Sequence, residues 1–426
     1  MRGTESSEGR GIMGIRSMTS ATMAAALIAL ATAAPASAEW VASWSASPHA
    51  PLGTEGPFAA AAYDNVTISQ ILRLSQGGDR LRVRFSNRYG PGPLTLGAAR
   101  IVRIDDQGAE IAGTSRTLSF GGDPVAVIPR GAPFTSDPVK LVVPSLARLK
   151  VEFYLPKPTG PCTCHLTGDD ELAVSPPGDY VGKAFTPVSK AQFRAFLSVV
   201  DVDAPQALGT IVAFGDSITD GVGATAGANH RWPDILANRL QEAGKHWAVA
   251  NAAISGNRIL SPGMGDSALA RFDEDVLSLP NVKYMIIFEG VNDIGNRFGS
   301  KGPNQPVIPG LDQPEITVEQ MIAGYKQLID RAHERGIKVI GSPIGPYKGA
   351  AYWSEDGEAA RDKINDWILN GGAFDGITRL DTAFADPADP QRMRESYQMG
   401  DHLHGSDAGL KAVGDSIDLS LFRPSH

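Results

Sequence analysis

The first half of the chain alternates hydrophobic and polar residues in short runs that are separated by turn residues. Five runs show this pattern: Val66–Leu74, Leu81–Phe85, Val125–Ile128, Val139–Val143 and Leu149–Leu155. A period of two is typical of half-buried strands, and Gly77-Gly78-Asp79 is the predicted turn between the first two runs. No run before residue 203 has the period of an amphipathic helix. We therefore expect a β-sandwich-like domain over residues 39–203.

After residue 204 strand-like apolar runs alternate with amphipathic segments. The strand-like runs are Thr210–Phe214, His246–Ala250, Val282–Phe288, Ile337–Ser342 and Ile377–Leu380. The helical segments are Trp232–Ala243, Val318–Arg335, Glu358–Leu369 and Asp407–Leu419. Gly244 and Gly336 stand where two of these helices should end. The alternation predicts an α/β domain over residues 204–426, with a parallel sheet covered by helices on both faces and functional residues beyond the carboxyl ends of its strands.

The first forty residues have the pattern of an export signal. Arg16 precedes an uncharged run from residue 22 to residue 34, and Ala36-Ser37-Ala38 supplies the small residues that a signal peptidase recognises. We therefore expect residues 1–38 to be a signal peptide and the mature protein to be periplasmic or extracellular. The run is shorter than the roughly 18 residues of a membrane span. Stable membrane insertion is therefore not expected, and an uncleaved anchor is the alternative.

Composition narrows the class of protein. A chain of 426 residues is too long for one ordinary core, which favours two domains. With 42% hydrophobic and 20% charged residues it has the composition of a folded globular protein. A net charge of −8 without a long basic run argues against nucleic acid as a partner. Nothing in the sequence indicates the oligomeric state.

The only two cysteines, Cys162 and Cys164, lie one residue apart and are followed by His165. An exported protein could oxidise them, but a bridge between positions i and i+2 is geometrically strained. Three adjacent candidate ligands without a second cluster make a poor metal site. We expect a local structural role for these residues, and no metal ion.

The tripeptide Gly-Asp-Ser occurs three times, and its setting differs each time. The copy at 265–267 lies in a loop rich in Pro and Gly, and the copy at 414–416 lies in the last helical segment. Only Gly215-Asp216-Ser217 directly follows an apolar strand and precedes a glycine-rich turn. A serine there can project its hydroxyl above the sheet edge, near a helix N-terminus that stabilises developing negative charge. Ser217 is therefore the candidate nucleophile.

A serine nucleophile needs a base, and the base needs an orienting partner. Asp401 stands three residues before His404 in a loop that leads into a helix. This spacing lets the carboxylate accept from Nδ1 of the imidazole while Nε2 faces outward. His402 is the competing base, but its side chain would point away if the loop is extended. We expect Asp401 and His404 to complete a catalytic triad with Ser217.

An oxyanion needs hydrogen-bond donors in addition to the amide of the nucleophile. The loop after the second strand offers the backbone N–H of Gly256, and the loop after the third strand offers the side-chain amide of Asn292. Each alone is more often part of a turn. Together with Ser217 they place polar loops after three successive strands, which is the stronger signal.

With these residues in order, the chain resembles the SGNH (GDSL) hydrolases, whose four block residues match Ser217, Gly256, Asn292 and His404. The chain also resembles a two-domain exported subgroup of this family, which is similar to xylan-associated acetyl esterases and arylesterases. The segments that carry this resemblance are residues 231–234, 255–258, 271–276, 289–295 and 400–404. Residues 40–48 and 81–87 look like the N-terminal domain of that subgroup. Gly405 departs from the proline that usually follows the histidine, which would loosen the His404 loop.

The resemblance implies the flavodoxin-like SGNH fold and a cofactor-free ester hydrolase. Ser217 would be the nucleophile, His404 the base and Asp401 its partner, with an oxyanion hole formed by Ser217, Gly256 and Asn292. The implied substrate is a small ester or an acetylated plant cell-wall polysaccharide. Two alternatives stay open: a broad-specificity arylesterase or lysophospholipase, and a carbohydrate-binding protein with an inactive hydrolase domain. The complete set of five catalytic residues disfavours the last.

Overall fold

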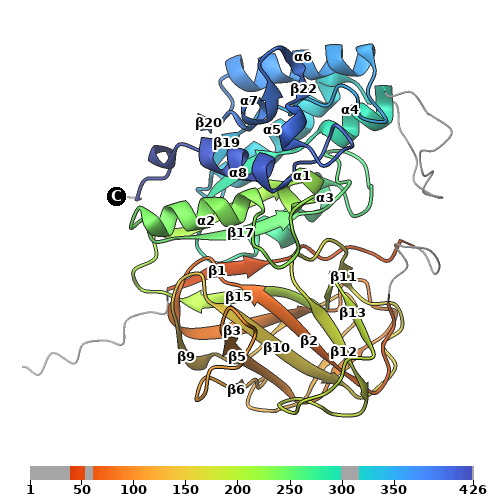
Figure 1. Ribbon diagram of the computed structural model, residues 1–426, viewed down its shortest axis with the longest axis vertical. Coiled ribbons are helices and arrows are strands. Elements are labelled where there is room, and N and C mark those ends of the chain that lie inside the picture. The colour runs from red at the N-terminus through yellow and green to blue at the C-terminus, as the bar shows by residue number, and fades with distance from the viewer. Residues whose placement is uncertain (1–38, 53–60, 299–315, 425–426) are drawn as a thin grey trace, which may run out of the picture. The chain divides into compact units, whose positions relative to one another are not determined.

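A computed structural model describes residues 39–52, 61–298 and 316–424 (Figure 1). The predicted signal peptide, residues 1–38, lies outside the described residues. We refer to residues 39–203 as the β half and to residues 204–424 as the α/β half. A domain boundary between them at residues 203–204 stays a prediction, because the two halves belong to the same unit.

The described residues of the β half form strands and no helix. Their bounds are β1 (Trp40–Ser45), β2 (Val66–Arg73), β3 (Gly78–Ser86), β4 (Leu94–Leu96), β5 (Ala99–Ile104), β6 (Arg116–Thr117), β7 (Ala126–Ile128), β8 (Pro133–Thr135), β9 (Val139–Val143), β10 (Arg148–Leu155), β11 (Cys164–His165), β12 (Leu172–Pro177), β13 (Ser189–Ala191), β14 (Arg194–Ala195) and β15 (Leu197–Asp203). The predicted all-β region is confirmed. The predicted turn is shifted: it lies at residues 74–77, and β3 already begins at Gly78. A Cβ at Gly78 would come within 2.4 Å of the Asp203 carbonyl oxygen, so this glycine allows close strand contact rather than a turn.

The strands of the β half form two main antiparallel sheets around one apolar core. One sheet has the order β1-β15-β3-β8, with β9 also paired to β3, and the other has the order β13-β12-β2-β10-β5-β6. Alternate residues of β3 and β10 are buried, as a period of two requires. Phe85 of the first sheet meets Phe153 of the second edge-on, with ring centroids 5.3 Å apart. The inward faces of the two sheets therefore share a core.

The α/β half alternates strands and helices. Its strands are β16 (Gly209–Gly215), β17 (Trp247–Ala253), β18 (Val282–Phe288), β19 (Lys338–Gly341), β20 (Gly376–Ile377), β21 (Ala385–Asp386) and β22 (Asp389–Met393). Its helices are α1 (Ser217–Asp220), α2 (Trp232–Glu242), α3 (Ala268–Phe272), α4 (Val291–Phe298), α5 (Val318–His333), α6 (Glu355–Asn370), α7 (Leu380–Phe384) and α8 (Asp407–Ser416), with the π-helical turn η1 (Asp273–Leu277) and the 3₁₀ turns η2 (Glu395–Tyr397) and η3 (Leu419–Leu421). The predicted strands and helices of this half are confirmed, with shifts of a few residues at their ends. Gly244 and Gly336 adopt the left-handed conformation just after α2 and α5, with φ of 65° and 68°.

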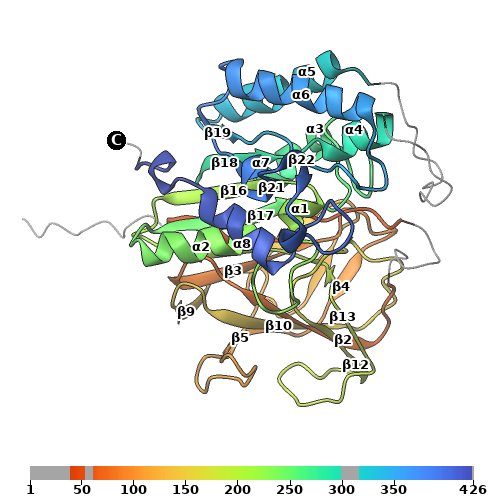
Figure 2. The ribbon, with the colours of Figure 1, turned by 45° about the horizontal axis from the view of Figure 1, so that its top comes forward.

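Five strands of this half form a parallel sheet in the order β17-β16-β18-β19-β20. This is the 2-1-3-4-5 order of flavodoxin-like folds. Figure 2 shows α5 and α6 on one side of the sheet and α2 and α8 on the other. Gly215, the last residue of β16, is paired with Ala253 of β17 and with Phe288 of β18. The carboxyl ends of three neighbouring strands therefore stand level at one edge of the sheet.

The β half packs against β17, the edge strand of the parallel sheet (Figure 1). The backbone N–H of Val249 donates to Ser75 Oγ at 2.9 Å, and Ser45 Oγ donates to the carbonyl of Asn251 at 2.8 Å. These side chains satisfy backbone groups that an uncovered edge strand would present to solvent. The two halves are therefore joined by hydrogen bonds to the edge strand of the parallel sheet as well as by the connecting chain.

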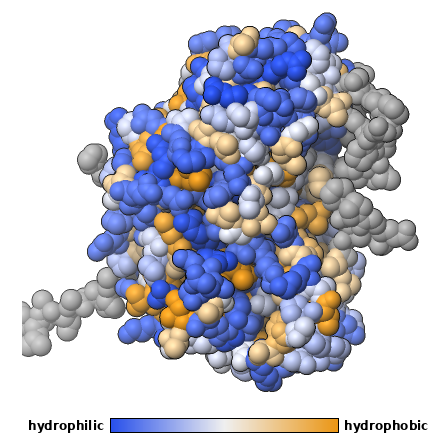
Figure 3. Space-filling model, viewed as in Figure 1, coloured by the Kyte–Doolittle hydropathy of each residue, from blue (hydrophilic) through white to orange (hydrophobic). Residues whose placement is uncertain are grey.

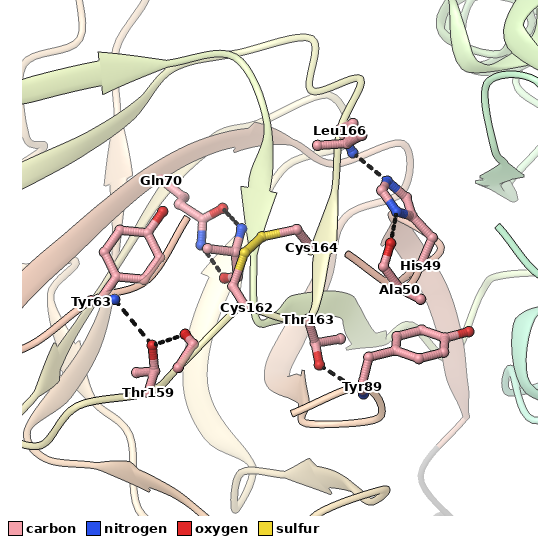
Figure 4. The surroundings of a disulfide bond; sticks show 12 residues. His49, Ala50, Tyr63, Gln70, Tyr89, Thr159, Cys162, Thr163, Cys164 and Leu166 are labelled. Carbon is pink, nitrogen blue, oxygen red and sulfur yellow. Dashed lines mark hydrogen bonds between the residues drawn. A yellow bond between two sulfur atoms is a disulfide. The ribbon is translucent and has the colours of Figure 1, made fainter. Parts of the chain in front are cut away.

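Cys162 and Cys164 are joined by a disulfide, which decides between the two states that their spacing left open (Figure 4). No group of three His, Cys, Asp or Glu side chains within the described ranges is arranged to hold a metal ion. No helix in those ranges is long and apolar enough to cross a membrane. On the face shown in Figure 3, hydrophobic residues form small patches among hydrophilic ones.

Thr210 allows a test of the contact between the halves. Its hydroxyl accepts from the N–H of Ala42 at 3.0 Å and donates to the carbonyl of Pro280 at 2.8 Å, and the residue is fully buried. Thr210→Val keeps the shape but leaves both backbone groups unsatisfied, which costs about 1–3 kcal/mol for each group. We expect a clear loss of unfolding free energy in urea titrations. Thr382→Val, at an exposed hydroxyl that donates to Arg379, should change it by about 0.5 kcal/mol or less; equal effects would contradict the prediction.

Candidate active site

Ser217 stands where β16 leads into the short helix α1. The preceding Gly215 has no room for a side chain, because a Cβ there would lie 2.4 Å from the Phe288 carbonyl oxygen and from Thr219 Oγ1. Asp216 then caps α1, accepting from the N–H of Ile218 at 3.0 Å. Ser217, at the first helical position, is 6% exposed. The sequence at this junction thus places its hydroxyl at the carboxyl edge of the sheet.

The predicted triad residues form one hydrogen-bond chain. His404 Nε2 lies 2.7 Å from Ser217 Oγ, and His404 Nδ1 lies 2.6 Å from Asp401 Oδ2. Because a carboxylate only accepts, Nδ1 carries the proton and Nε2 accepts from the Ser217 hydroxyl. Burial raises the pKa of Asp401, but hydrogen bonds from the His404 ring and from the N–H groups of His404 and Leu403 outweigh it and hold that pKa well below its usual value. Asp401 is therefore an ionised partner for the imidazole.

The competing His402 points elsewhere. Its Nδ1 lies 3.0 Å from Nε2 of Gln398, and its backbone is left-handed with φ of 61°. The loop is also held in place at Gly405, where we expected loosening: the carbonyl of His404 accepts from the N–H of Met399 at 3.0 Å, and a Cβ at Gly405 would come within 2.9 Å of the Phe384 ring. The glycine therefore fits a tight contact that leaves no space for a larger residue.

The two loops predicted to supply oxyanion donors are bonded to each other. Asn292, in the first turn of α4, donates from Nδ2 to the carbonyl of Asn257 at 3.0 Å. The Asn257 carbonyl can only accept, which identifies the NH2 end of the amide, and the hydroxyl of Tyr352 donates to Asn292 Oδ1 at 3.3 Å. Gly256 precedes Asn257 and has φ of 72°, a conformation that favours glycine. The structure thus brings these loops together beside the carboxyl end of β16.

A buried arginine in the 271–276 motif, to which sequence reasoning gave no role, holds this edge of the sheet together. Arg271 is 1% exposed and donates to the carbonyls of Gly215 at 3.0 Å and Ala252 at 2.5 Å, and to Asn257 Oδ1 at 2.9 Å. Its charge is paired with Asp275 at 2.9 Å. Its position on α3 between the buried Ala268 and Phe272 was the available signal, because an arginine on an apolar helix face needs buried acceptors.

Residues 213–412 match the model of the GDSL-like lipase/acylhydrolase family. This match identifies residues 213–412 as a domain of the SGNH (GDSL) hydrolase superfamily. The search of curated proteins found no match. The solved structures similar to this chain include an acetyl xylan esterase from Geobacillus stearothermophilus (18% identity, 49% of this chain and 91% of the other, TM-score 0.38). They also include a lipase/acylhydrolase from Enterococcus faecalis (20%, 48% and 91%, 0.36) and a psychrotrophic esterase from Pseudoalteromonas (16%, 49% and 93%, 0.33).

Behind the Ser217 turn, the SGNH hydrolase buries three carboxyl groups. Burial raises the pKa of Asp216 to about 7 although the Ile218 N–H bond lowers it, and burial raises the pKa of Asp293 to about 7 against its bonds from the N–H groups of Ile259 and Leu260. Burial likewise raises the pKa of Glu289, whose carboxylate is 3.8 Å from Arg271. Asp216 accepts from the N–H of Ile218 as a helix cap, whereas Asp401 makes the hydrogen bond to the imidazole of His404.

Arg271 should be the most sensitive of the supporting residues. Arg271→Met removes two hydrogen bonds to strand carbonyls and one to the Asn257 side chain, and it leaves the carboxylate of Asp275 buried without its cation. We expect the unfolding free energy in urea to fall by about 3–5 kcal/mol. Arg331→Met is the control, because this partly exposed arginine also bonds a carbonyl and an aspartate, Leu269 and Asp273, yet should cost only about 1 kcal/mol or less. A similar loss in both variants would contradict a special role for Arg271.

Proposed function

We propose that the protein is an exported serine ester hydrolase that removes acetyl or other short acyl groups through an acyl-enzyme. The hydrogen-bond chain from Ser217 through His404 to Asp401 is the observation that carries this proposal, since a serine nucleophile needs a base and the base needs an orienting carboxylate. Membership of the superfamily supports the reaction class, an esterase or acylhydrolase.

In the proposed mechanism, His404 Nε2 takes the Ser217 proton while Oγ attacks the ester carbonyl carbon. The resulting oxyanion accepts from the N–H groups of Ser217 and Gly256 and from the side-chain amide of Asn292. Asn292 can do so because its amide has two hydrogens and gives only one to Asn257. The imidazolium then protonates the leaving alcohol, and the acyl group stays on Ser217. His404 next deprotonates a water that attacks the acyl-enzyme, so that the acid leaves and the serine proton is restored.

The proposed natural substrate is an acetylated plant cell-wall polysaccharide. Two sequence features support it: the motif resemblance to xylan-associated acetyl esterases, and the signal-like residues 1–38, which would deliver the enzyme to the periplasm or the medium. The Cys162–Cys164 disulfide agrees with such an oxidising compartment. The catalytic machinery itself requires no metal ion or organic cofactor.

The two histidines of the 400–405 loop provide a matched test of the triad. With p-nitrophenyl acetate, Ser217→Ala and His404→Ala should each lower kcat by at least about 10⁴-fold, as loss of a nucleophile or its base does in serine hydrolases. His402→Ala should stay within about tenfold of the parent, because its ring bonds Gln398 and not the triad. Circular dichroism checks that each variant is folded. Activity that survives Ser217→Ala would exclude this serine as the nucleophile. Equal losses of kcat in His402→Ala and His404→Ala would leave open which of the two histidines is the base.

A second measurement addresses the substrate. Acetate released from acetylated xylan is compared with fatty acid released from a lysophospholipid and with hydrolysis of a long-chain aryl ester, using the Ser217→Ala protein as the blank. We expect the polysaccharide acetate to be released at the highest kcat/KM. Preference for the lysophospholipid or for aryl esters would replace the proposed substrate with a lipid or a broad range of esters and would leave the mechanism unchanged.

A further inference from the structure

A histidine of the β half reaches into the α/β half close to the nucleophile helix. His165, in β11, is 5% exposed. Its Nδ1 lies 2.9 Å from the carbonyl oxygen of Ser47, and its Nε2 lies 2.9 Å both from the carbonyl oxygen of Thr167 and from Oδ1 of Asp220. Asp220 is the last residue of α1, the helix that begins with Ser217.

The partners of this ring determine its protonation state. Carbonyl and carboxylate oxygens accept hydrogen bonds, so both ring nitrogens of His165 must donate and the ring is an imidazolium. Burial lowers the pKa of His165, but the charge of Asp220 and the hydrogen bonds to acceptors outweigh it and raise that pKa. His165 and Asp220 therefore form a buried ion pair with a defined geometry.

The neighbouring His49 is in the opposite state. Its Nδ1 donates to the carbonyl of Ala50 at 3.0 Å, while its Nε2 accepts from the N–H of Leu166 at 3.0 Å (Figure 4). Such a ring must be neutral, and burial lowers its pKa to about 4. The two rings lie 6.3 Å apart, centroid to centroid. His49 thus supports the backbone next to His165 without adding a charge.

The second oxygen of Asp220 holds the loop that carries the proposed oxyanion donor. Asp220 Oδ2 accepts from the N–H of Ser255 at 2.9 Å and from Ser255 Oγ at 2.8 Å. Thr167 Oγ1 lies 2.7 Å from Ser255 Oγ. Because the single hydroxyl proton of Ser255 goes to the carboxylate, Thr167 must be the donor in that contact. The order of donation is therefore Thr167 to Ser255 to Asp220, with His165 donating to the same carboxylate.

This network fixes the distance between Ser217 and the loop that contains Gly256, and the proposed reaction depends on that distance. Asp220 closes the helix that begins at the nucleophile, and Ser255 directly precedes Gly256, so one carboxylate ties the nucleophile to the loop of an oxyanion donor. Without the imidazolium, Asp220 would be a buried carboxylate without its cation and would have to take up a proton or turn toward other donors. Either change would release Ser255 and shift the N–H of Gly256. A misplacement of about 1 Å at a catalytic group can cost about 100-fold in rate.

We propose that His165 and Thr167 are positioning residues through which the β half sets the oxyanion hole of the hydrolase. The β half is then part of the active site and not a separable binding module. This proposal rests on the proposed function, because it assigns the Gly256 N–H to the oxyanion. Neither residue touches the reacting atoms; both act through Asp220 and Ser255.

The test compares two buried histidines that stand side by side. With p-nitrophenyl acetate, His165→Leu in the full chain should lower kcat about 10- to 100-fold at nearly constant KM. His49→Leu should lower the urea midpoint through the unsatisfied Leu166 N–H but keep kcat within about threefold. Ser255→Ala should lower kcat to a similar extent as His165→Leu. In the double variant the two losses should not multiply, because both act on the same loop.

The outcomes separate this proposal from the proposed function. If His165→Leu keeps the parent kcat, or if its loss multiplies with that of Ser255→Ala, His165 is structural only and the proposal is overturned. If His165→Leu does not fold, Thr167→Val decides, because it removes only the hydroxyl that donates to Ser255. A severalfold lower kcat at constant KM in that variant supports the proposal, and an unchanged kcat overturns it. The proposed function fails separately, through activity that survives Ser217→Ala.

Discussion

The carboxyl edge of the parallel sheet depends on the hydrogen bonds that the buried guanidinium of Arg271 donates. A cation removed from water must find acceptors for its donors, and Arg271 finds them at the ends of β16 and β17 and on Asn257. Two stretches of the chain, the end of β16 at Gly215 and the segment 252–257, are thereby held at one point. Ser217 follows the first stretch, and Gly256 lies within the second. The positions of the Ser217 turn and of the Gly256 loop thus both depend on one buried charge.

The β half completes this arrangement from the other side. The edge strand β17 would expose unsatisfied backbone groups without Ser75 and Ser45, and Asp220 would be an unpaired buried carboxylate without His165. Both needs are met by side chains of residues 39–203. The pattern of strands and helices favours a description as two domains. The α/β half nevertheless depends on hydrogen bonds from the β half, both at its edge strand β17 and at Asp220 near Ser217.

Most elements of the fold could be predicted because alternation and helical periodicity are local signals. Ser217, Asp401 and His404 could be named because each stands in a recognisable local motif, although Ser217 and His404 lie 187 residues apart. No such motif indicated the contact of Arg271 with Gly215 or that of His165 with Asp220, which span 56 and 55 residues of the chain. The turn before β3 was misplaced for a similar reason: Gly78 is needed by a contact with Asp203, and no local pattern reveals that contact. What the sequence leaves open is mostly the set of long-range buried polar contacts.

Two of the Asp–His pairs among the described residues, Asp401–His404 and Asp220–His165, have similar geometry and opposite chemical character. Asp401 and Asp220 each accept from a histidine ring, at 2.6 and 2.9 Å. The difference lies at the second ring nitrogen. In His404 it faces the Ser217 hydroxyl, which can donate, so this nitrogen keeps its lone pair and can act as a base. In His165 it faces the carbonyl of Ser47, which can only accept, so the ring must keep both protons and its charge. A single change of partner, from hydroxyl to carbonyl, thus separates a ring that can take up a proton from one that can only hold a carboxylate in place.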